Sequence, residues 1–270
     1  VKALGPRVWG YSTAVVRRIE RAREEGLELF ADQYAYTASA TGLSAALVPR
    51  WAQEGGNARM RERFQDAELR PRIVEEMWEN LDRRGGADRI QFRSHGPDPS
   101  IEGRTLEEVA VERGKDAVET ALELLTEGSP GIVSFNMDDR DLAELMRQPW
   151  TMASSDGEFP VWGEGVPHPR AYGAFARRLR VYVQEEGVLG LEEAIRGMTS
   201  LTAQVHRMDD RGLVRAGSVA DLAVFDLDRV RDRATFTEPH QYAEGMVHVL
   251  VNGVLALENG EPTGARAGRG

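Results

Sequence analysis

The amino-acid sequence predicts an α/β protein with a small all-β segment at its C-terminal end. Two observations support this prediction. Through about residue 206, short apolar runs alternate with longer runs that have helical spacing, which is typical of parallel β/α units. Beyond residue 207 the helical pattern ends, and short strand-like runs separated by turn residues replace it. We therefore expect two domains, residues 1–206 and residues 207–270.

The helices are predicted from the spacing of apolar residues and from residues that favour helix ends. Residues 12–25 have apolar positions at helical spacing, with Ser12 as the expected N-cap and Gly26 as the expected stop. Thr105 and Glu108 have the spacing of a capping box and open another helix. The remaining expected helices are 57–84, 105–113, 116–127, 138–147, 171–186, 191–198 and 200–206.

Strands are expected where short apolar runs lie between these helices. Their ranges are 27–34, 89–93, 131–136 and 150–155. Functional groups of parallel β/α folds sit at the C-terminal ends of strands, and Asp32 and Asp156 fall at or near such ends. In the last domain, residues 217–226 read as a turn feeding a strand, and residues 247–257 as two strands around an Asn-Gly hairpin turn.

Composition excludes several classes of protein. The net charge is −10 and the basic residues are scattered, so we expect no nucleic-acid-binding face. No run of about 18 apolar residues occurs, so no membrane span is expected. The lack of cysteine excludes a cysteine-ligated zinc site within these residues and fits a cytoplasmic protein. The start at Val1 has neither a signal-peptide pattern nor an initiator methionine, and we expect it to be the interior of a longer protein.

The segment from Thr151 to Arg170 is the best candidate for chemistry. An apolar run ends in Asp156 followed by glycine, and Arg170 follows shortly afterwards. A carboxylate at the end of a buried strand can bind a metal or move a proton, and a nearby arginine can bind a substrate carboxylate. The alternative for Asp156 is a turn aspartate, because Asp-Gly is common in turns. The alternative for Arg170 is a surface residue at a helix start.

Several stretches of this chain resemble the D-aminoacylases (N-acyl-D-amino-acid deacylases) of the amidohydrolase superfamily. The matching stretches run nearly end to end, and the two most specific are His168-Pro169-Arg170-Ala171-Tyr172-Gly173 and the Ala234-Thr235-Phe236 element followed by Pro239-His240. The others are Asp32 to Ser39, Glu102 to Leu106, Ser155-Asp156-Gly157 and Met198 to Ala203.

The resemblance implies a fold and an activity. The fold is the C-terminal half of a (β/α)8 amidohydrolase-type barrel with a small β-sandwich appendage. The activity is zinc-dependent hydrolysis of an N-acyl-D-amino acid to a carboxylate and a D-amino acid. Asp156 matches the family's general base, which also touches the metal-bound water, and Arg170 matches the arginine that holds the substrate's α-carboxylate. Tyr34 and Tyr36 are expected to line the substrate pocket, although packing is the alternative for both.

The chain departs from the family pattern at the metal site. None of its five histidines forms the paired spacing of a zinc site, and a catalytic zinc takes about three protein ligands. We therefore expect the chain to be a fragment that lacks the N-terminal metal ligands and binds zinc weakly alone. His168 is expected to orient its loop rather than bind metal. A second departure is Ala35, where the family usually has proline.

Two other functions remain open at this point. The first is another amidohydrolase activity, on cyclic amides or dipeptides. The second is a non-catalytic truncated half-barrel that packs with a partner, either the missing N-terminal half or another copy of itself. The sequence does not decide between D and L substrates, and it does not identify the acyl group.

Overall fold

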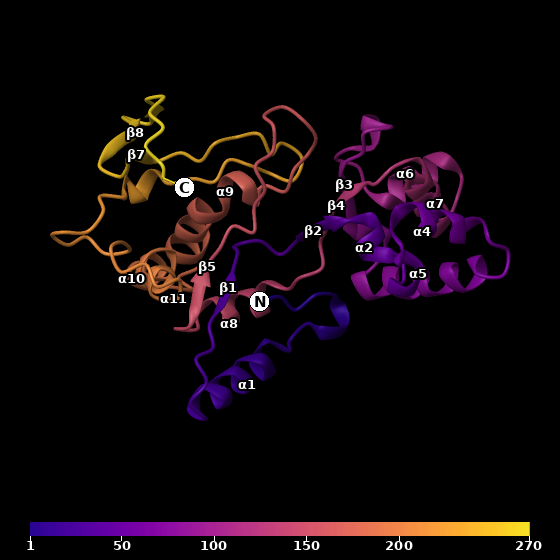
Figure 1. Cartoon of the computed structure of the whole chain (residues 1–270), viewed down its shortest axis with the longest axis horizontal. Helices are drawn as coiled ribbons and strands as arrows, with labels where there is room; N and C mark the ends of the chain where they lie inside the picture. Colours follow the sequence, from indigo (N-terminus) through magenta and orange to yellow (C-terminus); the bar gives the residue numbers. More distant parts are fainter. Residues whose placement is uncertain (270) are drawn as a thin grey trace.

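A pair of parallel strands joins the beginning and the middle of the chain. In the computed structural model, which describes residues 1–269, β1 (Ala31–Gln33) pairs with β5 (Thr151–Ala153). The register places Gln33 opposite Ala153. Figure 1 shows the two strands side by side near the middle of the molecule. Because the strands are parallel, the segments that leave their C-terminal ends emerge at the same edge.

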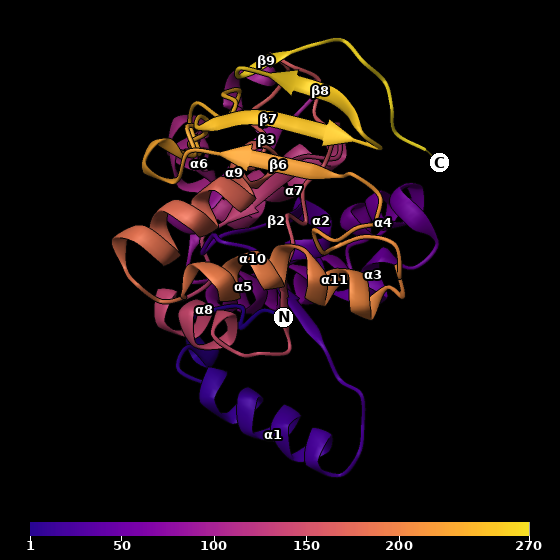
Figure 2. The ribbon, with the colours of Figure 1, turned by 90° about the vertical axis from the view of Figure 1, so that its left-hand side faces the viewer.

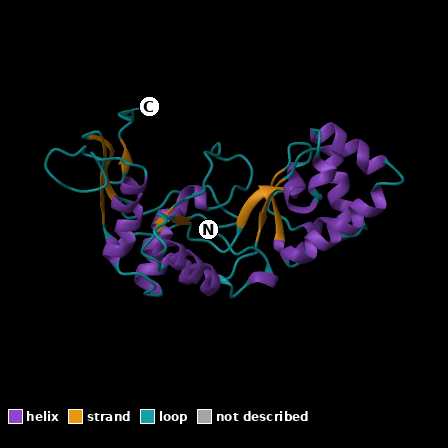
Figure 3. Cartoon of the chain, turned by 60° about the horizontal axis from the view of Figure 1, so that its bottom comes forward, coloured by secondary structure: helices purple, strands orange, loops and turns teal. Residues whose placement is uncertain are grey.

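Between β1 and β5 the chain forms a lobe with its own apolar core (Figure 1, right). Its three-stranded sheet has the order β2-β4-β3, and helices cover it, as Figure 3 shows. The strands are β2 (Ser39–Gly42), β3 (Ile90–Ser94) and β4 (Gly131–Ser134). The helices are α2 (Leu43–Leu47), α3 (Arg50–Gln53), α4 (Gly56–Gln65), α5 (Arg70–Arg84), α6 (Leu106–Arg113) and α7 (Ala117–Glu127), with the short 3-10 turns η2 (Ala87–Arg89) and η3 (Pro99–Ile101).

The sheet of this lobe corrects the expectation of parallel β/α units. Both of its strand pairs, β2 with β4 and β3 with β4, are antiparallel. A single helix between two strands returns the chain for a parallel strand, but two helices, α6 and α7, lie between β3 and β4. The second helix reverses the chain once more, so β4 runs against β3. Within residues 1–269 the parallel arrangement is seen for β1 and β5. The (β/α)8 half-barrel therefore stays a prediction.

The remaining helices come from the start of the chain and from the part that follows β4. They are η1 (Pro6–Val8), α1 (Ser12–Glu24), α8 (Asp139–Met146), α9 (Arg170–Arg177), the π-helical continuation η4 (Arg178–Glu185), α10 (Leu191–Met198) and α11 (Ser200–Val205). The apolar faces of α8, α9, η4 and α10 form a second core, in which Tyr34, Leu142 and Tyr182 are almost fully buried, and α1 packs through Val16 against Leu145 and Trp150. This core lies behind the C-terminal ends of β1 and β5.

The last segment forms an antiparallel sheet that is a separate layer over the helices (Figure 2). Its strands are β6 (Leu222–Phe225), β7 (Met246–Val251), β8 (Val254–Glu258) and β9 (Glu261–Pro262), with the turn η5 (Leu227–Arg229) after β6. The predicted hairpin is confirmed, because Asn252 and Gly253 connect β7 to β8 with φ values of 49° and 78°. The sandwich and the domain boundary at residue 207 stay predictions.

Helix ends show where the sequence signals were sufficient. The capping box at Thr105 is confirmed, since its hydroxyl accepts from the Glu108 backbone and the Glu108 carboxylate accepts from the Thr105 backbone. The N-cap prediction for Ser12 is wrong. Ser12 is the first helical residue, and its backbone N–H donates to the Asp141 carboxylate at 3.0 Å. A carboxylate from a distant helix thus replaces the local cap.

Some element bounds also differ from the prediction. The helix expected at 57–84 is two helices, because the chain turns at Asp66, whose carboxylate accepts the backbone N–H groups of Glu68 and Leu69. Of the strand expected at 27–34, only the residues of β1 are in a strand. The elements β2, α2 and α3 were not predicted. No helix among residues 1–269 is both long enough and apolar enough to cross a lipid bilayer.

A buried carboxylate fixes α9 against the segment that follows β6. The Asp232 side chain is 3% exposed and pairs with Arg180 at 2.5 Å and with Arg177 at 3.3 Å. Arg177 also donates to the Ala35 carbonyl at 2.8 Å. Two arginines of the α9–η4 helix therefore connect it both to the segment after β1 and to the C-terminal part of the chain.

Replacing Asp232 with Asn should destabilise the protein by about 2–3 kcal/mol, because it leaves two cations without their carboxylate. The value is moderate because both arginines keep some contact with solvent. Chemical denaturation measures the loss. The exposed Asp209→Asn is the matched control and should change the free energy of unfolding by less than about 0.5 kcal/mol. Equal effects of the two changes would contradict this assignment.

Candidate functional site

Asp156 lies just beyond the C-terminal end of β5, in an unusual backbone conformation. Its φ is 47°, in the left-handed region that favours glycine and tolerates aspartate. The following Gly157 is tightly packed, since a Cβ there would lie 3.2 Å from the Ala171 backbone. The close approach to α9 and the positive φ together direct the Asp156 side chain toward the start of that helix. Strained residues of this kind concentrate at functional sites.

Two cations contact the same oxygen of Asp156. Nζ of Lys2 lies 2.6 Å from Oδ2, and Nη1 of Arg170 lies 3.0 Å from it. Lys2 comes from the start of the chain, and Arg170 is the first residue of α9. The Arg170 side chain is 6% exposed, whereas Asp156 is 46% exposed. The carboxylate is thus accessible from solvent, and the guanidinium lies beneath it.

The Asp156 carboxyl is held in its ionised form. Partial burial raises its pKa, but the hydrogen bond from Lys2 and the charge of Arg170 outweigh burial, so the pKa lies below its usual value. A carboxylate in this state accepts a proton only when one cation moves away or finds another partner. A substrate that carries its own carboxylate provides such a partner.

Tyr34, which follows β1, supports both cations. Its ring centroid lies 4.7 Å from Nζ of Lys2 and 4.9 Å from Cζ of Arg170, within the range of cation–π attraction. Its hydroxyl donates to the Ala38 carbonyl at 2.9 Å. Burial raises the pKa of this hydroxyl, so Tyr34 stays neutral. Tyr34 thus offers its aromatic face to both cations that hold Asp156.

Tyr36 packs against His168 rather than against Asp156. It is 3% exposed, and its ring meets the His168 ring edge-on at 5.2 Å. A side chain at Gly173 would lie 2.6 Å from the Tyr36 hydroxyl, so glycine there lets α9 approach. Burial raises the pKa of Tyr36 far above its ordinary value. Of the two predicted pocket tyrosines, the structure brings Tyr34 to Asp156 and places Tyr36 behind His168.

His168 uses one ring nitrogen to bind the segment before β2 and the other to bind its own loop. Nε2 donates to the Ala38 carbonyl at 3.0 Å, and Nδ1 accepts from the Arg170 backbone N–H at 3.1 Å. Acceptance at Nδ1 requires the neutral ring, and burial lowers the His168 pKa to about 3. His168 therefore orients the loop and places Arg170, in agreement with the sequence analysis.

The residues of this chain do not fit a zinc ion by themselves. Among residues 1–269, no three histidine, aspartate or glutamate side chains come close enough together to hold a metal. Asp156 is the predicted metal ligand, but its Oδ2 is already shared by two cations. Asp32, on β1, accepts from the Ser154 hydroxyl at 2.7 Å and adds no ligand to the Asp156 group.

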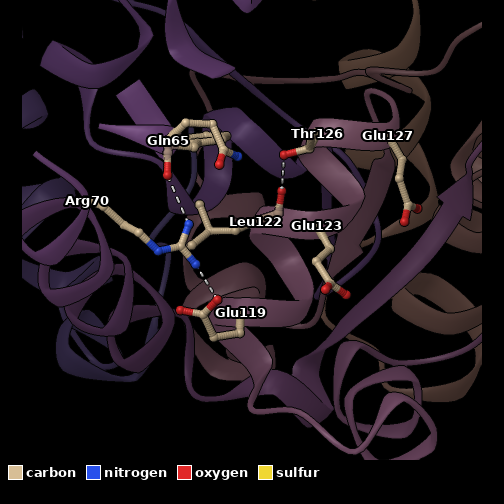
Figure 4. A pocket seen from close by; sticks show the side chains of 8 residues that line it. Gln65, Arg70, Glu119, Leu122, Glu123, Thr126 and Glu127 are labelled. Atoms are coloured by element: carbon tan, nitrogen blue, oxygen red, sulfur yellow. Dashed lines mark hydrogen bonds and ion pairs between the residues drawn. The ribbon is translucent and has the colours of Figure 1, made fainter. Parts of the chain in front are cut away.

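A separate pocket lies on the lobe between β1 and β5. Figure 4 shows this pocket of 460 Å³, whose lining comes from α4, α5 and α7. Its only arginine, Arg70, is paired with Glu119 and with the Phe64 carbonyl. Since Arg70 is already paired and no lining residue belongs to the Asp156 group, we do not assign the chemistry to this pocket.

Comparison with known proteins places the chain in a family. Residues 13–256 match the sequence profile of the amidohydrolase family. The chain belongs to the amidohydrolase family. An N-acyl-D-glutamate deacylase of Alcaligenes xylosoxydans xylosoxydans is 33% identical over 262 residues, which are 97% of this chain and 45% of that protein. A D-aminoacylase of the same organism is 40% identical over 173 residues, covering 64% of this chain and 34% of the relative.

Solved structures agree with this assignment. A D-aminoacylase crystal structure matches 99% of this chain and 48% of its own with a TM-score of 0.77 and 33% identity. An N-acyl-D-glutamate deacylase from Bordetella bronchiseptica, complexed with zinc and a phosphonate inhibitor, matches 97% of this chain and 47% of its own with a TM-score of 0.73 and 32% identity. The mixed α/β fold and the resemblance to D-aminoacylases are thus confirmed for this amidohydrolase chain. The chain spans about half the length of the relatives it matches.

The sequence analysis named two members of the Asp156 group as candidates and missed a third. Asp156 and Arg170 were predicted, and they lie in contact. Lys2 received no role in the sequence analysis. Its contact with a carboxylate 154 residues away leaves no trace in local spacing.

The neutral, buried His168 should make the protein less stable in acid. The unfolded histidine binds a proton near pH 6.5, whereas the folded one does so only near pH 3. This contribution is therefore intact above pH 6.5 and is lost as the pH falls toward 3, by up to about 1.4 kcal/mol per pH unit.

Urea unfolding of the native protein and of His168→Gln at pH 7 and pH 5 measures this effect. The native protein should lose more stability between the two pH values than the variant, because glutamine does not titrate. The exposed His206→Gln serves as the control and should keep the native pH dependence. Equal pH dependence in the native protein and His168→Gln would contradict the buried neutral ring.

Proposed function

We propose that this amidohydrolase chain forms the substrate-carboxylate and proton-transfer part of an enzyme that hydrolyses N-acyl-D-amino acids. The observation that carries the proposal is one carboxylate, Asp156, held by two cations of which one is buried. The named relatives, an N-acyl-D-glutamate deacylase and a D-aminoacylase, act on substrates of this kind, and they support the choice of reaction. The preference for D substrates rests on these relatives alone.

Arg170 is the proposed ligand of the substrate's α-carboxylate. It is the first residue of α9, its backbone is fixed by His168, and its guanidinium is buried against the Tyr34 ring. A planar guanidinium can bind a carboxylate with two parallel hydrogen bonds, which sets the orientation of the substrate as well as its affinity. Lys2, which is 31% exposed, adds a second positive charge on the solvent side.

Asp156 is the proposed general base and then general acid. When the substrate's α-carboxylate takes over Arg170, the carboxylate of Asp156 loses part of its positive surroundings and becomes more basic. It can then accept the proton of the attacking water and return it to the leaving nitrogen as the C–N bond breaks. The products are a carboxylate and a free amino acid.

Zinc is the proposed cofactor, and we propose that residues outside these 270 supply most of its ligands. Two observations support this: the described residues hold no cluster of three metal ligands, and the chain covers about half of each relative. Asp156 is the one ligand that we propose for this chain. The half-barrel and β-sandwich appendage expected from the sequence are part of the same proposal.

Replacing Asp156 with Asn in the intact native protein should lower kcat about 10²- to 10⁴-fold, the range expected for loss of a general base. Asparagine keeps the size of the side chain, so circular dichroism should not change. Hydrolysis of N-acetyl-D-methionine measures the effect, and Asp209→Asn is the control. Native kcat in the Asp156→Asn protein would contradict the role of this carboxylate.

Replacing Arg170 with Lys should raise KM for N-acetyl-D-methionine about tenfold, because lysine keeps the charge but loses the two-pronged contact. The comparison substrate is an N-acetyl alkylamine, the same amide without the α-carboxylate. Its KM should change less than about twofold. If the two substrates respond equally, Arg170 does not bind the carboxylate, and an activity on cyclic amides is favoured.

The non-catalytic alternative has a clear outcome in the same experiments. If the intact protein binds about one zinc per chain and hydrolyses no N-acyl-D-amino acid, cyclic amide or dipeptide, the Asp156 group has only a structural role. Turnover that disappears in Asp156→Asn excludes a non-catalytic chain.

A further inference from the structure

A second arginine shares a small cavity with Arg170. The cavity, of 10 Å³, is about large enough for one water molecule. Arg93, at the end of β3, lines it from one side, and His168 and Arg170 line it from another. The loop that follows Asp156 closes it with Glu158. The cavity is therefore adjacent to the proposed α-carboxylate site. It is lined both by the lobe between β1 and β5 and by the segment that follows β5.

Each of the two arginines has a buried nitrogen that makes no hydrogen bond among the described residues. Nε of Arg93 is buried and has no hydrogen-bond partner among the described residues. Nη1 of Arg170 lies 3.0 Å from Asp156, but no acceptor is aligned for a hydrogen bond with it. Buried guanidinium N–H groups are rarely left without an acceptor, because they have lost water without gaining a replacement. Two arginines with spare donors that line one cavity favour an anionic ligand.

The charges around the cavity point the same way. The cavity and the adjoining Asp156 group together contain three cations, Lys2, Arg93 and Arg170, and two carboxylates, Asp156 and Glu158. His168 adds no charge, since its ring is neutral. The group therefore carries one more positive than negative charge, before a substrate brings its own carboxylates.

Glu158 is suited to act as an exchangeable partner for Arg93. Its carboxylate lies 2.5 Å from Nη1 of Arg93, yet its side chain is 58% exposed, whereas the Arg93 side chain is 20% exposed. The loop does not depend on this ion pair alone. The Val166 backbone N–H donates to the Arg93 carbonyl at 2.8 Å, and His240 Nε2 donates to the Gly165 carbonyl at 3.1 Å. Glu158 can thus swing into solvent while the loop stays attached.

We propose that Arg93 binds a second carboxylate on the substrate, the side-chain carboxylate of an acidic N-acyl amino acid, which displaces Glu158. This inference rests on the proposed function and narrows its substrate class to acidic side chains. Arg170 takes the α-carboxylate, and Arg93, on the other side of the same cavity, takes the carboxylate a few bonds away. A neutral side chain leaves Arg93 paired with Glu158 and gains nothing from the second guanidinium.

The test compares two isosteric substrates, N-acetyl-D-glutamate and N-acetyl-D-glutamine, on the intact native protein. Their kcat/KM ratio measures the preference for the acid; where no turnover occurs, the ratio of their Kd values from calorimetry replaces it. The native protein should prefer the acid at least tenfold. Arg93→Gln should lower this preference about 10- to 100-fold, the range for a hydrogen-bonded charge. Glu158→Gln should raise it, because the competing carboxylate is gone.

The opposite signs of the two variants separate substrate binding from a structural ion pair. If Arg93 and Glu158 only stabilise the loop, both variants change the preference for the acid in the same direction. That outcome overturns the inference. A native preference near or below one also overturns it. Arg93→Lys retains the charge if Arg93→Gln fails to fold, and it should keep part of the preference. The exposed Arg17→Gln is the matched control and should leave the ratio unchanged.

The proposed function and this inference fail in different ways. Hydrolysis of N-acetyl-D-methionine with no preference for N-acetyl-D-glutamate over N-acetyl-D-glutamine overturns only the inference about Arg93. The other outcome is that N-acetyl-D-glutamate binds with the predicted variant effects but no N-acyl-D-amino acid is hydrolysed. That result contradicts the proposed function and leaves Arg93 as a carboxylate ligand.

Discussion

The contact of one carboxylate with two cations is the interaction on which the candidate site depends. Asp156 is accessible to solvent, but Lys2 and Arg170 keep its pKa low and its proton affinity small. A group held in this way is a poor base until another anion takes one of its partners. A substrate carboxylate can do so, and binding would then itself increase the basicity of Asp156. The arrangement couples recognition of the substrate to the proton transfer that follows.

The fold builds this contact from distant parts of the chain. The parallel pairing of β1 with β5 brings the residues after both strands to one edge, so that Tyr34 lies below the cations that hold Asp156. His168 fixes the start of α9 through two hydrogen bonds that require its neutral form. The lobe between the two strands then contributes Arg93, whose guanidinium faces the same small cavity. The site therefore depends on the lobe as well as on the strand pair.

The sequence predicted the parts of this arrangement that have local signals. Asp156 follows an apolar run and precedes a glycine, and Arg170 lies in a motif specific to D-aminoacylases, so both were found. The antiparallel sheet of the lobe was missed because strand direction depends on how many helices intervene, and β2 is too short to show a pattern. The cap on Ser12 and the roles of Lys2 and Arg93 depend on contacts across 129, 154 and 65 residues, which spacing alone does not encode.

The most direct test of this account is a crystal structure of the intact protein with a non-hydrolysable N-acyl-D-amino acid analogue. The account predicts that the α-carboxylate of the analogue makes two hydrogen bonds to the Arg170 guanidinium. It also predicts that the Asp156 carboxylate has left Arg170 and faces the group that replaces the scissile amide. An analogue whose α-carboxylate binds elsewhere, with Asp156 still paired to both Lys2 and Arg170, would contradict it.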